Sequence, residues 1–405
     1  MKRIANILML LCLLFWQTAA SANTGTTSPS STAKKVPVLE LKGNAYERGY
    51  QHGKQLKASI AEVYQKWKES IRKDTQKDPD AVISDFIRTS SYKETILKWT
   101  PGLWKEVEGM AAGSGQKLED VLAFQLIDEY WGYLDRLKHG SVDKDHCSAM
   151  GVAATKSHPA YVAQNIDIDT YMHGYQVLLH IAASGDTPEQ YVMTCAGFIG
   201  FAGMNNRGVG VVINALTDLN NSVDGLPVTF VTRGLLNQKS GDAALAFVKS
   251  VRHATGQNYI IGAGESVLNY EASANRVVEF NPVPDKKLVY HTNHSIANHD
   301  VKPWMEEYHQ RILSGTGPQT NSQTRYAALE KRLASPGVQL SPELVKTTLR
   351  SKDSDRFPVC VSYNKDAVAF TFSSVFFTLG ERPSVQVTYG PPDQSEYQEH
   401  FFKTR

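Results

Sequence analysis

The sequence predicts an α+β protein in which helices cover both faces of mainly antiparallel sheets. The apolar residues of the N-terminal third recur mostly at helical spacing. From Cys147 onward the spacing changes to two, which is typical of strands. Runs of these strands are then flanked by pairs of helical segments, and this order favours a layered architecture.

The first expected helices lie at residues 46–68, 106–112 and 119–134. Gly43 and Asn44 precede the first helix, and the glycines at 113 and 115 end the second. Strands are expected at residues 161–166, 177–182, 190–194, 208–214, 258–261, 277–280, 287–291, 359–363, 367–372 and 384–388, with helices at 229–236, 242–251, 304–313 and 325–333. The chain contains no internal repeat.

The N-terminus has the pattern of a secretory signal peptide. Lys2 and Arg3 are followed by an apolar stretch over residues 4–16 and by small residues up to Ala22. We therefore expect residues 1–22 to be removed and the protein to be periplasmic or secreted. Residues 23–36, rich in Ser, Thr and Ala, are expected to form a flexible leader. No later segment approaches about 18 consecutive apolar residues, so no membrane span is predicted.

The charge pattern argues against a nucleic-acid partner. The formal net charge of +2 falls to about zero (2 − 2 = 0) once Lys2 and Arg3 are removed. Binding of a phosphate backbone requires clustered Lys and Arg, whereas this chain intersperses both signs.

Three cysteines remain after removal of the signal, namely Cys147, Cys195 and Cys360. In an oxidising compartment an odd count leaves one thiol over or one that pairs outside the chain. A disulfide between Cys195 and Cys360 would leave Cys147 unpaired, but three cysteines allow three pairings. No C-x-x-C spacing occurs, so neither a zinc ribbon nor a thioredoxin-type site is supported.

A reaction centre is predicted around Cys147. Two apolar runs, at 151–154 and 160–163, flank the turn signal at residues 156–159 and together predict a β-hairpin. The turn lies midway between Cys147 and Asp167. Residues equidistant from the turn face each other in such a hairpin, so Cys147 should lie near Asn165 and Asp167 at its open end. The alternative is a buried structural cysteine beside an acidic loop.

These motifs resemble the acyl-coenzyme A:6-aminopenicillanic acid acyltransferase family, whose wider kin include penicillin V acylases and bile salt hydrolases. The resemblance rests on their order and spacing and covers nearly all of the chain after the leader. The matching segments are Cys147-Ser148, residues 164–167, 204–216, 291–294, 43–53, 108–111, 227–236 and 371–375.

The resemblance implies a four-layer αββα N-terminal-nucleophile hydrolase sandwich, formed by residues 37–405 as a single domain. Such a protein is made as a precursor that cuts itself before its nucleophile, here between His146 and Cys147. Residues up to 146 and residues 147–405 would then form two chains that stay associated. No cofactor or metal is implied.

The expected chemistry starts from the new N-terminus. An α-amino group has an ordinary pKa of about 7.7 to 8.0, so it can accept the thiol proton of its own residue at ordinary pH. The Cys147 thiolate then attacks an amide carbonyl, the amine leaves, and water or a second amine resolves the thioester.

The family match assigns roles to further residues. Asp167 holds the new amine, Asn293 donates to the oxyanion with Asn214 as a second candidate, and Arg325 lies near the catalytic amine and carboxylate. Gln164 and Asn165 are the expected substrate-binding residues. The substrate class is an N-acylated small molecule with a linear amide bond.

The chain departs from its relatives in two places. His146 stands where relatives commonly have a small residue, and its bulk would slow self-cleavage or its imidazole would assist the acyl shift. Gln164 stands where bile salt hydrolases have Arg, although the penicillin acyltransferase branch also carries Gln there.

Three other interpretations are weaker. Asp167 to Thr170 after an apolar strand is similar to an aspartyl phosphatase motif, but Gln164 and Asn165 interrupt that strand. Histidines at 173, 291, 294 and 299 suggest a metal cluster, against which structural histidines are the more common finding. A non-catalytic binding module with an inert Cys147 is the remaining alternative. Tyr171, Tyr175, Phe198 and Phe201 fit either an acyl pocket or an ordinary core.

Overall fold

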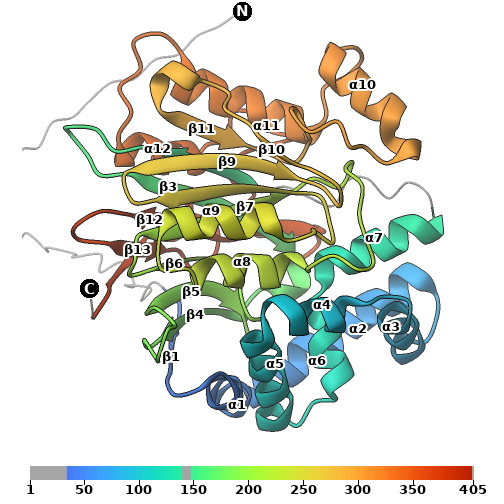
Figure 1. Cartoon of the computed structure of the whole chain (residues 1–405). Coiled ribbons are helices and arrows are strands. Elements are labelled where there is room, and N and C mark those ends of the chain that lie inside the picture. The colour runs from blue at the N-terminus through green and yellow to red at the C-terminus, as the bar shows by residue number, and fades with distance from the viewer. Residues whose placement is uncertain (1–33, 139–146, 404–405) are drawn as a thin grey trace, which may run out of the picture. The chain divides into compact units, whose positions relative to one another are not determined.

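The computed structural model describes residues 34–138 and 147–403. The predicted signal peptide, most of the leader and His146 lie outside the described residues. Residues 34–405 form one compact unit. Two β-sheets form the centre of this unit (Figure 1).

The larger sheet has eight strands, and all of its neighbouring strands are antiparallel except the parallel pair β1 and β4. In spatial order they are β1 (Val38–Leu41), β4 (Gln176–Ile181), β5 (Gln190–Cys195), β6 (Ala202–Asn205), β7 (Val209–Ala215), β8 (Gln257–Ala263), β9 (Ser266–Ala272) and β10 (Val277–Glu279). From β4 to β10 each strand is antiparallel to the one before it in the chain, and the connection from β7 to β8 carries α8 (Val228–Leu236) and α9 (Gly241–Ser250).

The smaller sheet has six antiparallel strands. In spatial order they are β11 (Leu288–His291), β2 (Ser148–Val152), β3 (Tyr161–Asp169), β12 (Ala369–Thr378), β13 (Ser384–Val387) and β14 (Gln398–Phe401). The predicted hairpin is confirmed as β2 and β3. Its register pairs Ser148 with Asn165, which is one residue away from the register that the midpoint of the turn predicted.

The sheets pack face to face. An added Cβ at Gly151 of β2 would meet Ile260 of β8 at 3.0 Å, and one at Gly210 of β7 would meet Val162 of β3 at 3.2 Å. Two helices, α8 (Val228–Leu236) and α9 (Gly241–Ser250), cover the outer face of the larger sheet, while α11 (Asn321–Leu329) and α12 (Pro342–Leu349) cover that of the smaller sheet (Figure 1). The predicted four-layer αββα arrangement is confirmed.

The N-terminal third is helical, as predicted. It comprises α1 (Ala45–Gln55), α2 (Lys57–Thr75), α3 (Pro79–Arg88), α4 (Tyr92–Trp99), α5 (Pro101–Ser114), α6 (Leu118–Phe124) and α7 (Ile127–Lys138). The expected single helix over 46–68 is wrong, because Leu56 leaves helical geometry with φ −107° and ψ 20° between α1 and α2. The expected helix over 119–134 is likewise divided into α6 and α7.

The pair α1 and α5 shows why that N-terminal segment is rich in glycine. Its backbones approach so closely that a Cβ at Gly49 would lie 1.8 Å from the carbonyl oxygen of Glu106. A Cβ at Gly109 would lie 2.1 Å from the carbonyl oxygen of Tyr46. Only glycine permits this contact, which fixes α5 and so the helices that follow it.

The remaining elements follow the C-terminal half of the chain. Helix α10 (Glu306–Ser314) is preceded by a 3₁₀ turn at Pro303–Met305, and α11 continues into a π-helical turn at Glu330–Ala334. The strand expected at residues 359–363 is wrong. Its backbone groups are bound individually: the carbonyl of Val359 accepts from Asn165, and the N–H of Cys360 donates to Ser351.

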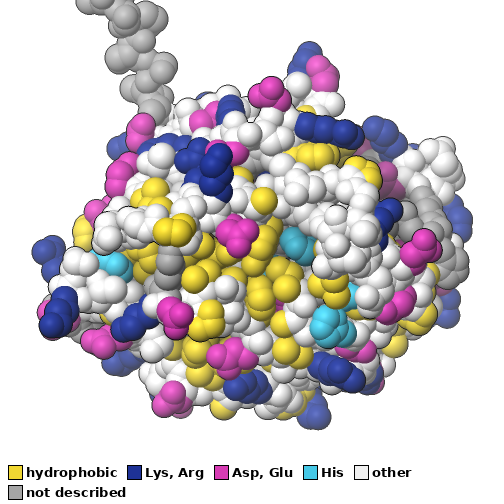
Figure 2. All heavy atoms as spheres, turned by 90° about the horizontal axis from the view of Figure 1, so that it is seen from above, with side chains coloured by type: hydrophobic (Ala, Val, Ile, Leu, Met, Phe, Trp, Pro, Cys, Tyr) yellow, Lys and Arg dark blue, Asp and Glu magenta, His cyan; other side chains and the backbone are white. Residues whose placement is uncertain are grey.

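Charged side chains of both signs are interspersed on the face shown in Figure 2, around a stretch of hydrophobic side chains. Within residues 34–138 and 147–403, no helix is long and apolar enough to cross a membrane.

Candidate active site

Cys147 lies immediately before β2, partly buried at the open end of the β2–β3 hairpin. Its Sγ is 3.8 Å from the backbone oxygen of Asp167, so the two predicted residues are neighbours. The carbonyl oxygen of Cys147 accepts hydrogen bonds from Asn214 Nδ2 at 3.0 Å and from Arg325 Nη1 at 2.6 Å. These donors come from the larger sheet and from α11, and together they fix the backbone at the cysteine.

Asp167, near the end of β3, is a buried carboxylate, with its side chain among apolar residues and close to Thr371 of β12. Neither of its oxygens has a well-formed hydrogen bond within the described part of the chain. Burial raises the pKa of Asp167 to about 7, and the Thr371 hydroxyl and the Arg325 charge offset only part of that effect. The site therefore holds an acidic group that lacks a cationic partner in direct contact.

Arg325 is fully buried on α11 and connects the predicted site residues to one another. Its Nη1 also donates to Ser148 Oγ at 3.0 Å, and its Nη2 donates to Asn293 Oδ1 at 3.0 Å. Its Nε donates to Asn321 Oδ1 at 2.6 Å. Because the guanidinium is a rigid planar fork, one side chain fixes both the Cys147 backbone and the Asn293 amide.

The two candidate oxyanion donors lie on either side of the Cys147 backbone. Asn293 follows β11, and its Nδ2 donates to the carbonyl of Ala215 at 3.0 Å while its backbone N–H donates to Ser322 Oγ at 2.6 Å. Asn214 is fully buried on β7 and, besides Cys147, donates to the carbonyl of His291 at 3.4 Å. Asn214 is thus held by the carbonyl of Cys147 itself, and Asn293 by the carbonyl of Ala215.

Gln164 and Asn165 point to opposite faces of β3. Gln164 faces the larger sheet, where its Nε2 donates to the Ile213 carbonyl at 2.6 Å and its Oε1 accepts from the Ile213 N–H at 3.2 Å. Asn165 faces α12 and donates to the carbonyls of Leu349 and Val359 at 2.8 and 2.9 Å. The Asn165 amide is therefore held by two backbone carbonyls on the face of β3 opposite to Gln164, and the substrate-binding role expected for it stays a prediction.

An apolar cavity of about 50 Å³ opens beside the Cys147 thiol. Its walls include Ile127, Ile166, Met172, Phe201 and Ile213. Of the four aromatic residues expected around the site, Phe201 alone lines this cavity. Phe198 stacks on Phe201 with ring centroids 4.4 Å apart and, like Tyr171 and Tyr175, belongs to the surrounding core.

The other cysteines do not form the disulfide considered from the sequence. Cys195 on β5 and Cys360 are both buried thiols. Burial raises the pKa of each thiol well above its ordinary value, and Cys360 donates to Asp393 Oδ1 at 3.1 Å. Their low thiolate fraction makes both groups unreactive compared with an activated nucleophile.

The histidines considered as a metal cluster have separate partners. His291 Nε2 lies 2.8 Å from Glu271 Oε1, and His173 stacks on Tyr363 with centroids 3.7 Å apart. His294 Nδ1 lies 2.7 Å from Ser322 Oγ, so it supports the loop that carries Asn293.

Sequence reasoning missed residues that come from distant elements. Thr371 sits opposite Asp167 on β12, Ser322 anchors Asn293 from α11, and Asp128 and Trp131 reach the cavity from α7. Asp128 and Trp131 belong to none of the segments that resemble the family, whereas Thr371 lies in such a segment, 371–375, which did not reveal its position opposite Asp167. One feature of the sequence could have pointed to Asp128 and Trp131: their helix, α7, comes shortly before the predicted cleavage site and therefore close to Cys147 along the chain.

The family model for acyl-coenzyme A:6-aminopenicillanic acid acyl-transferase matches residues 153–393, more than half of the 405-residue chain. The chain belongs to this family. The protein is therefore an enzyme, and the resemblance predicted from the motifs is confirmed. A curated relative, the 40 kDa form of acyl-coenzyme A:6-aminopenicillanic-acid-acyltransferase of Emericella nidulans, is 24% identical over 359 residues, covering 86% of this chain and 92% of the relative.

Two solved structures are also similar to the present protein. A variant of conjugated bile acid hydrolase from Clostridium perfringens has a TM-score of 0.38 at 11% identity, covering 63% of this chain and 97% of that one. Penicillin V acylase from Agrobacterium tumefaciens has a TM-score of 0.38 at 12% identity, covering 60% and 82%.

Proposed function

We propose that the protein is an exported, self-processing thiol enzyme that releases or transfers the acyl group of an N-acylated small molecule through a thioester on Cys147. The observation that carries the proposal is the buried Asp167 carboxylate, which has no well-formed hydrogen bond in the described chain and belongs to a residue that lines the same cavity as Cys147. An α-ammonium group created at Cys147 would supply the missing partner.

The first step is cleavage of the peptide bond between His146 and Cys147. Arg325 and Asn214 hold the Cys147 carbonyl, so the thiol stays in a fixed position relative to the preceding peptide bond. The thiol attacks the His146 carbonyl carbon, its proton goes to the peptide nitrogen, and that nitrogen leaves as the new amine. Water then hydrolyses the thioester between His146 and Cys147, which gives the His146 carboxylate and restores the thiol. His146 and the residues before it lie outside the described residues.

Substrate turnover uses the same atoms. The new α-amino group takes the Cys147 thiol proton, and the Asp167 carboxylate stabilises the resulting ammonium. The thiolate attacks the amide carbon, and the ammonium returns its proton to the nitrogen that leaves. Asn293 is positioned by Arg325 to donate to the oxyanion, and loss of such a donor typically lowers kcat by about 10²- to 10³-fold. Asn214, the second candidate, would have to release the Cys147 or the His291 carbonyl in order to donate.

The two chains made by cleavage are expected to stay together as one domain over residues 37–405. Strand β1 pairs with β4 across the cut. Two buried ion pairs also cross it: Arg233 donates to Glu106 at 2.9 Å, and Lys302 donates to Asp135 at 2.9 Å. Separation would leave buried charges unpaired, which typically costs about 3 to 5 kcal/mol for each broken pair.

The acyl group is expected in the apolar cavity beside Cys147. That cavity is small, so a long acyl chain requires side chains such as Met172 and Phe201 to move. Water or a second amine completes the reaction by attacking the thioester, which gives hydrolysis or acyl transfer respectively.

The test is intact mass spectrometry of the purified protein together with amide turnover. Wild type should give two fragments, the larger beginning at Cys147, and should release amine from members of a panel of N-acyl amides. Cys147→Ala should remain a single inactive chain, whereas the matched control Cys195→Ala should be cut and active. An uncut and inactive wild type would refute the proposal. Export is tested separately, by sequencing the N-terminus of protein recovered outside the cytoplasm.

A further inference from the structure

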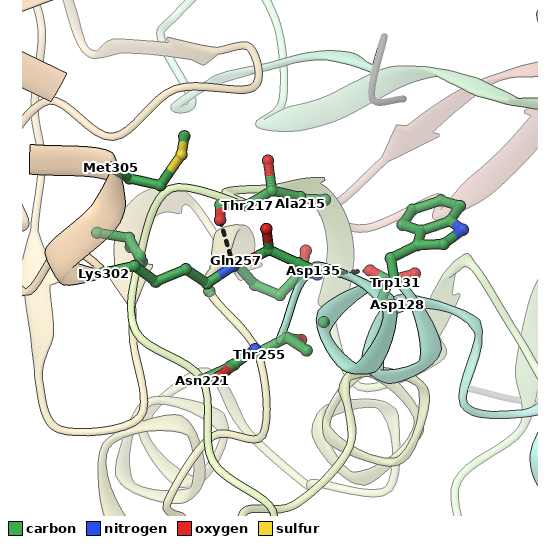
Figure 3. A pocket seen from close by; sticks show the side chains of 13 residues that line it. Asp128, Trp131, Asp135, Ala215, Thr217, Asn221, Thr255, Gln257, Lys302 and Met305 are labelled. Carbon is green, nitrogen blue, oxygen red and sulfur yellow. Dashed lines mark hydrogen bonds and ion pairs between the residues drawn. The ribbon is translucent and has the colours of Figure 1, made fainter. Parts of the chain in front are cut away.

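A second cavity adjoins the one beside Cys147. It is bounded by α7, by the end of β7, by the start of β8 and by the segment around Lys302. Asp128, Trp131 and Ala215 line both cavities. Figure 3 shows Asp128, Trp131 and Asp135 on α7, with Lys302 and Met305 approaching from another segment.

Two of the lining side chains present acceptors. Gln257 is only 1% exposed, and its Nε2 donates to Asp128 Oδ2 at 2.5 Å. The Gln257 Oε1 atom has no hydrogen-bond partner within residues 34–138 and 147–403. A buried amide oxygen without a donor costs stability, typically about 1 to 3 kcal/mol. A ligand with an N–H group would remove that cost.

The charges of the lining leave an excess of negative charge at Asp128. Lys302 is buried, and its ammonium donates to Asp135 Oδ2 at 2.9 Å and to the Thr217 carbonyl at 2.6 Å. Its charge is therefore balanced by Asp135. Burial raises the pKa of Asp128 and of the neighbouring Glu129, while the hydrogen bond from Gln257 favours the ionised form of Asp128.

The second cavity lies where the amine half of a bound amide would be expected. If the acyl group occupies the apolar cavity, the amine half of the amide lies on the other side of the carbonyl that Cys147 attacks. The Ala215 carbonyl, which accepts from Asn293, is in the wall shared by the two cavities. Asp128 and Trp131 also belong to this shared wall, and the aromatic face of Trp131 attracts a cation.

We propose that the second cavity binds the amine half of the substrate and that this half carries an additional ammonium group, recognised by Asp128, Gln257 and Trp131. The inference rests on the proposed amide-cleaving function and specifies its substrate class. A negatively charged amine half would meet the Asp128 carboxylate and would be rejected, because burying a like charge there is unfavourable.

The test compares three amides that share one acyl group and differ in the amine half: 1,4-diaminobutane, pentylamine and 4-aminobutyrate. The comparison is repeated for phenylacetyl, hexanoyl and decanoyl chains, with product measured by mass spectrometry. For wild type, kcat/KM should be at least tenfold higher for the diamine than for pentylamine, and lowest for 4-aminobutyrate. Asp128→Asn should reduce the ratio of the kcat/KM values for the diamine and pentylamine amides by about tenfold, and a general loss of activity would leave this ratio unchanged.

Asp366→Asn, which changes an exposed loop carboxylate, is the matched control and should keep the wild-type ranking. Equal turnover of the three amides by wild type, or a preference for 4-aminobutyrate, would overturn the inference while the proposed function stands. If wild type cleaves none of the amides, the proposed function and the inference that rests on it both fail. The ranking of kcat/KM values for the three amides in wild type tests the inference even if Asp128→Asn does not fold.

Discussion

The strongest quantitative prediction concerns Asp167 before self-cleavage. In the single-chain form this carboxyl is buried beside Cys147, and its pKa is raised from an ordinary 3.8 to about 7. Between these two values the folded state keeps the proton and the unfolded state releases it. Stability therefore falls as pH rises from 3.8 to about 7, because the folded state binds more protons.

The magnitude follows from the size of the rise. One pKa unit corresponds to about 1.4 kcal/mol, so Asp167 costs the uncut form about 4 kcal/mol at pH 8 and less than about 1 kcal/mol at pH 4. Asn has nearly the same shape and stays neutral. In the uncut Cys147→Ala protein, Asp167→Asn should therefore raise the free energy of unfolding by about 4 kcal/mol at pH 8 and have little effect at pH 4.

The assay is reversible urea unfolding of Cys147→Ala and Cys147→Ala/Asp167→Asn between pH 4 and pH 8. Asp366→Asn in the same background serves as the control, and as an exposed substitution it should stay within about 0.5 kcal/mol of its parent at every pH. If the difference between the first two proteins does not change with pH, Asp167 does not carry an unfavourable buried charge. The proposed pairing of Asp167 with a new ammonium would then lose its energetic basis.

Three further predictions concern single contacts. Arg325→Lys should lower kcat by at least 10²-fold with the fold retained in circular dichroism, because an ammonium cannot reach Cys147, Ser148 and Asn293 together; turnover within threefold of wild type would contradict this. Gln164→Leu should reduce the free energy of unfolding by about 1 to 3 kcal/mol in urea, since both backbone groups of Ile213 lose their partner, and an unchanged midpoint would show that water replaces the amide. Gly49→Ala should lower Tm by several degrees in calorimetry, since its Cβ would lie 1.8 Å from a carbonyl oxygen of α5. The exposed α9 variant Asp242→Asn is the control. Equal Tm values for the two variants would mean that α1 and α5 can move apart to accommodate the methyl group.

The local sequence determined the β2–β3 hairpin, because the spacing of apolar residues and the turn residues that specify it are neighbours in the chain. The change from helical to alternating spacing at Cys147 located the start of β2, and the turn signal at 156–159 identified its partner β3. The position of Cys147 beside Asp167 followed from that hairpin. Period and turn chemistry are properties of neighbouring residues, so they can be read without knowing the fold.

Tertiary structure decided which side chains face the site. The hairpin register differs by one residue from the predicted one, and side chains alternate between faces of a strand. Because of this alternation Gln164 and Asn165 point to opposite faces in any register, and the packing of the layers places Gln164 against the larger sheet and Asn165 against α12. The helix breaks at Leu56 and after α6 also depend on packing between distant segments, which outweighs local propensity.

The second cavity, which adjoins the one beside Cys147, could not be predicted from the sequence. Asp128, Gln257 and Lys302 lie far apart in the sequence and belong to three different segments, and each looks like an ordinary polar residue in its own segment. These three side chains line one cavity only because α7, β8 and the segment before α10 enclose it in the folded protein. The sequence determined the family and the predicted position of the reactive cysteine. The enclosure of buried charge, which sets pKa values and on which the proposed substrate preference rests, was decided by the assembled fold.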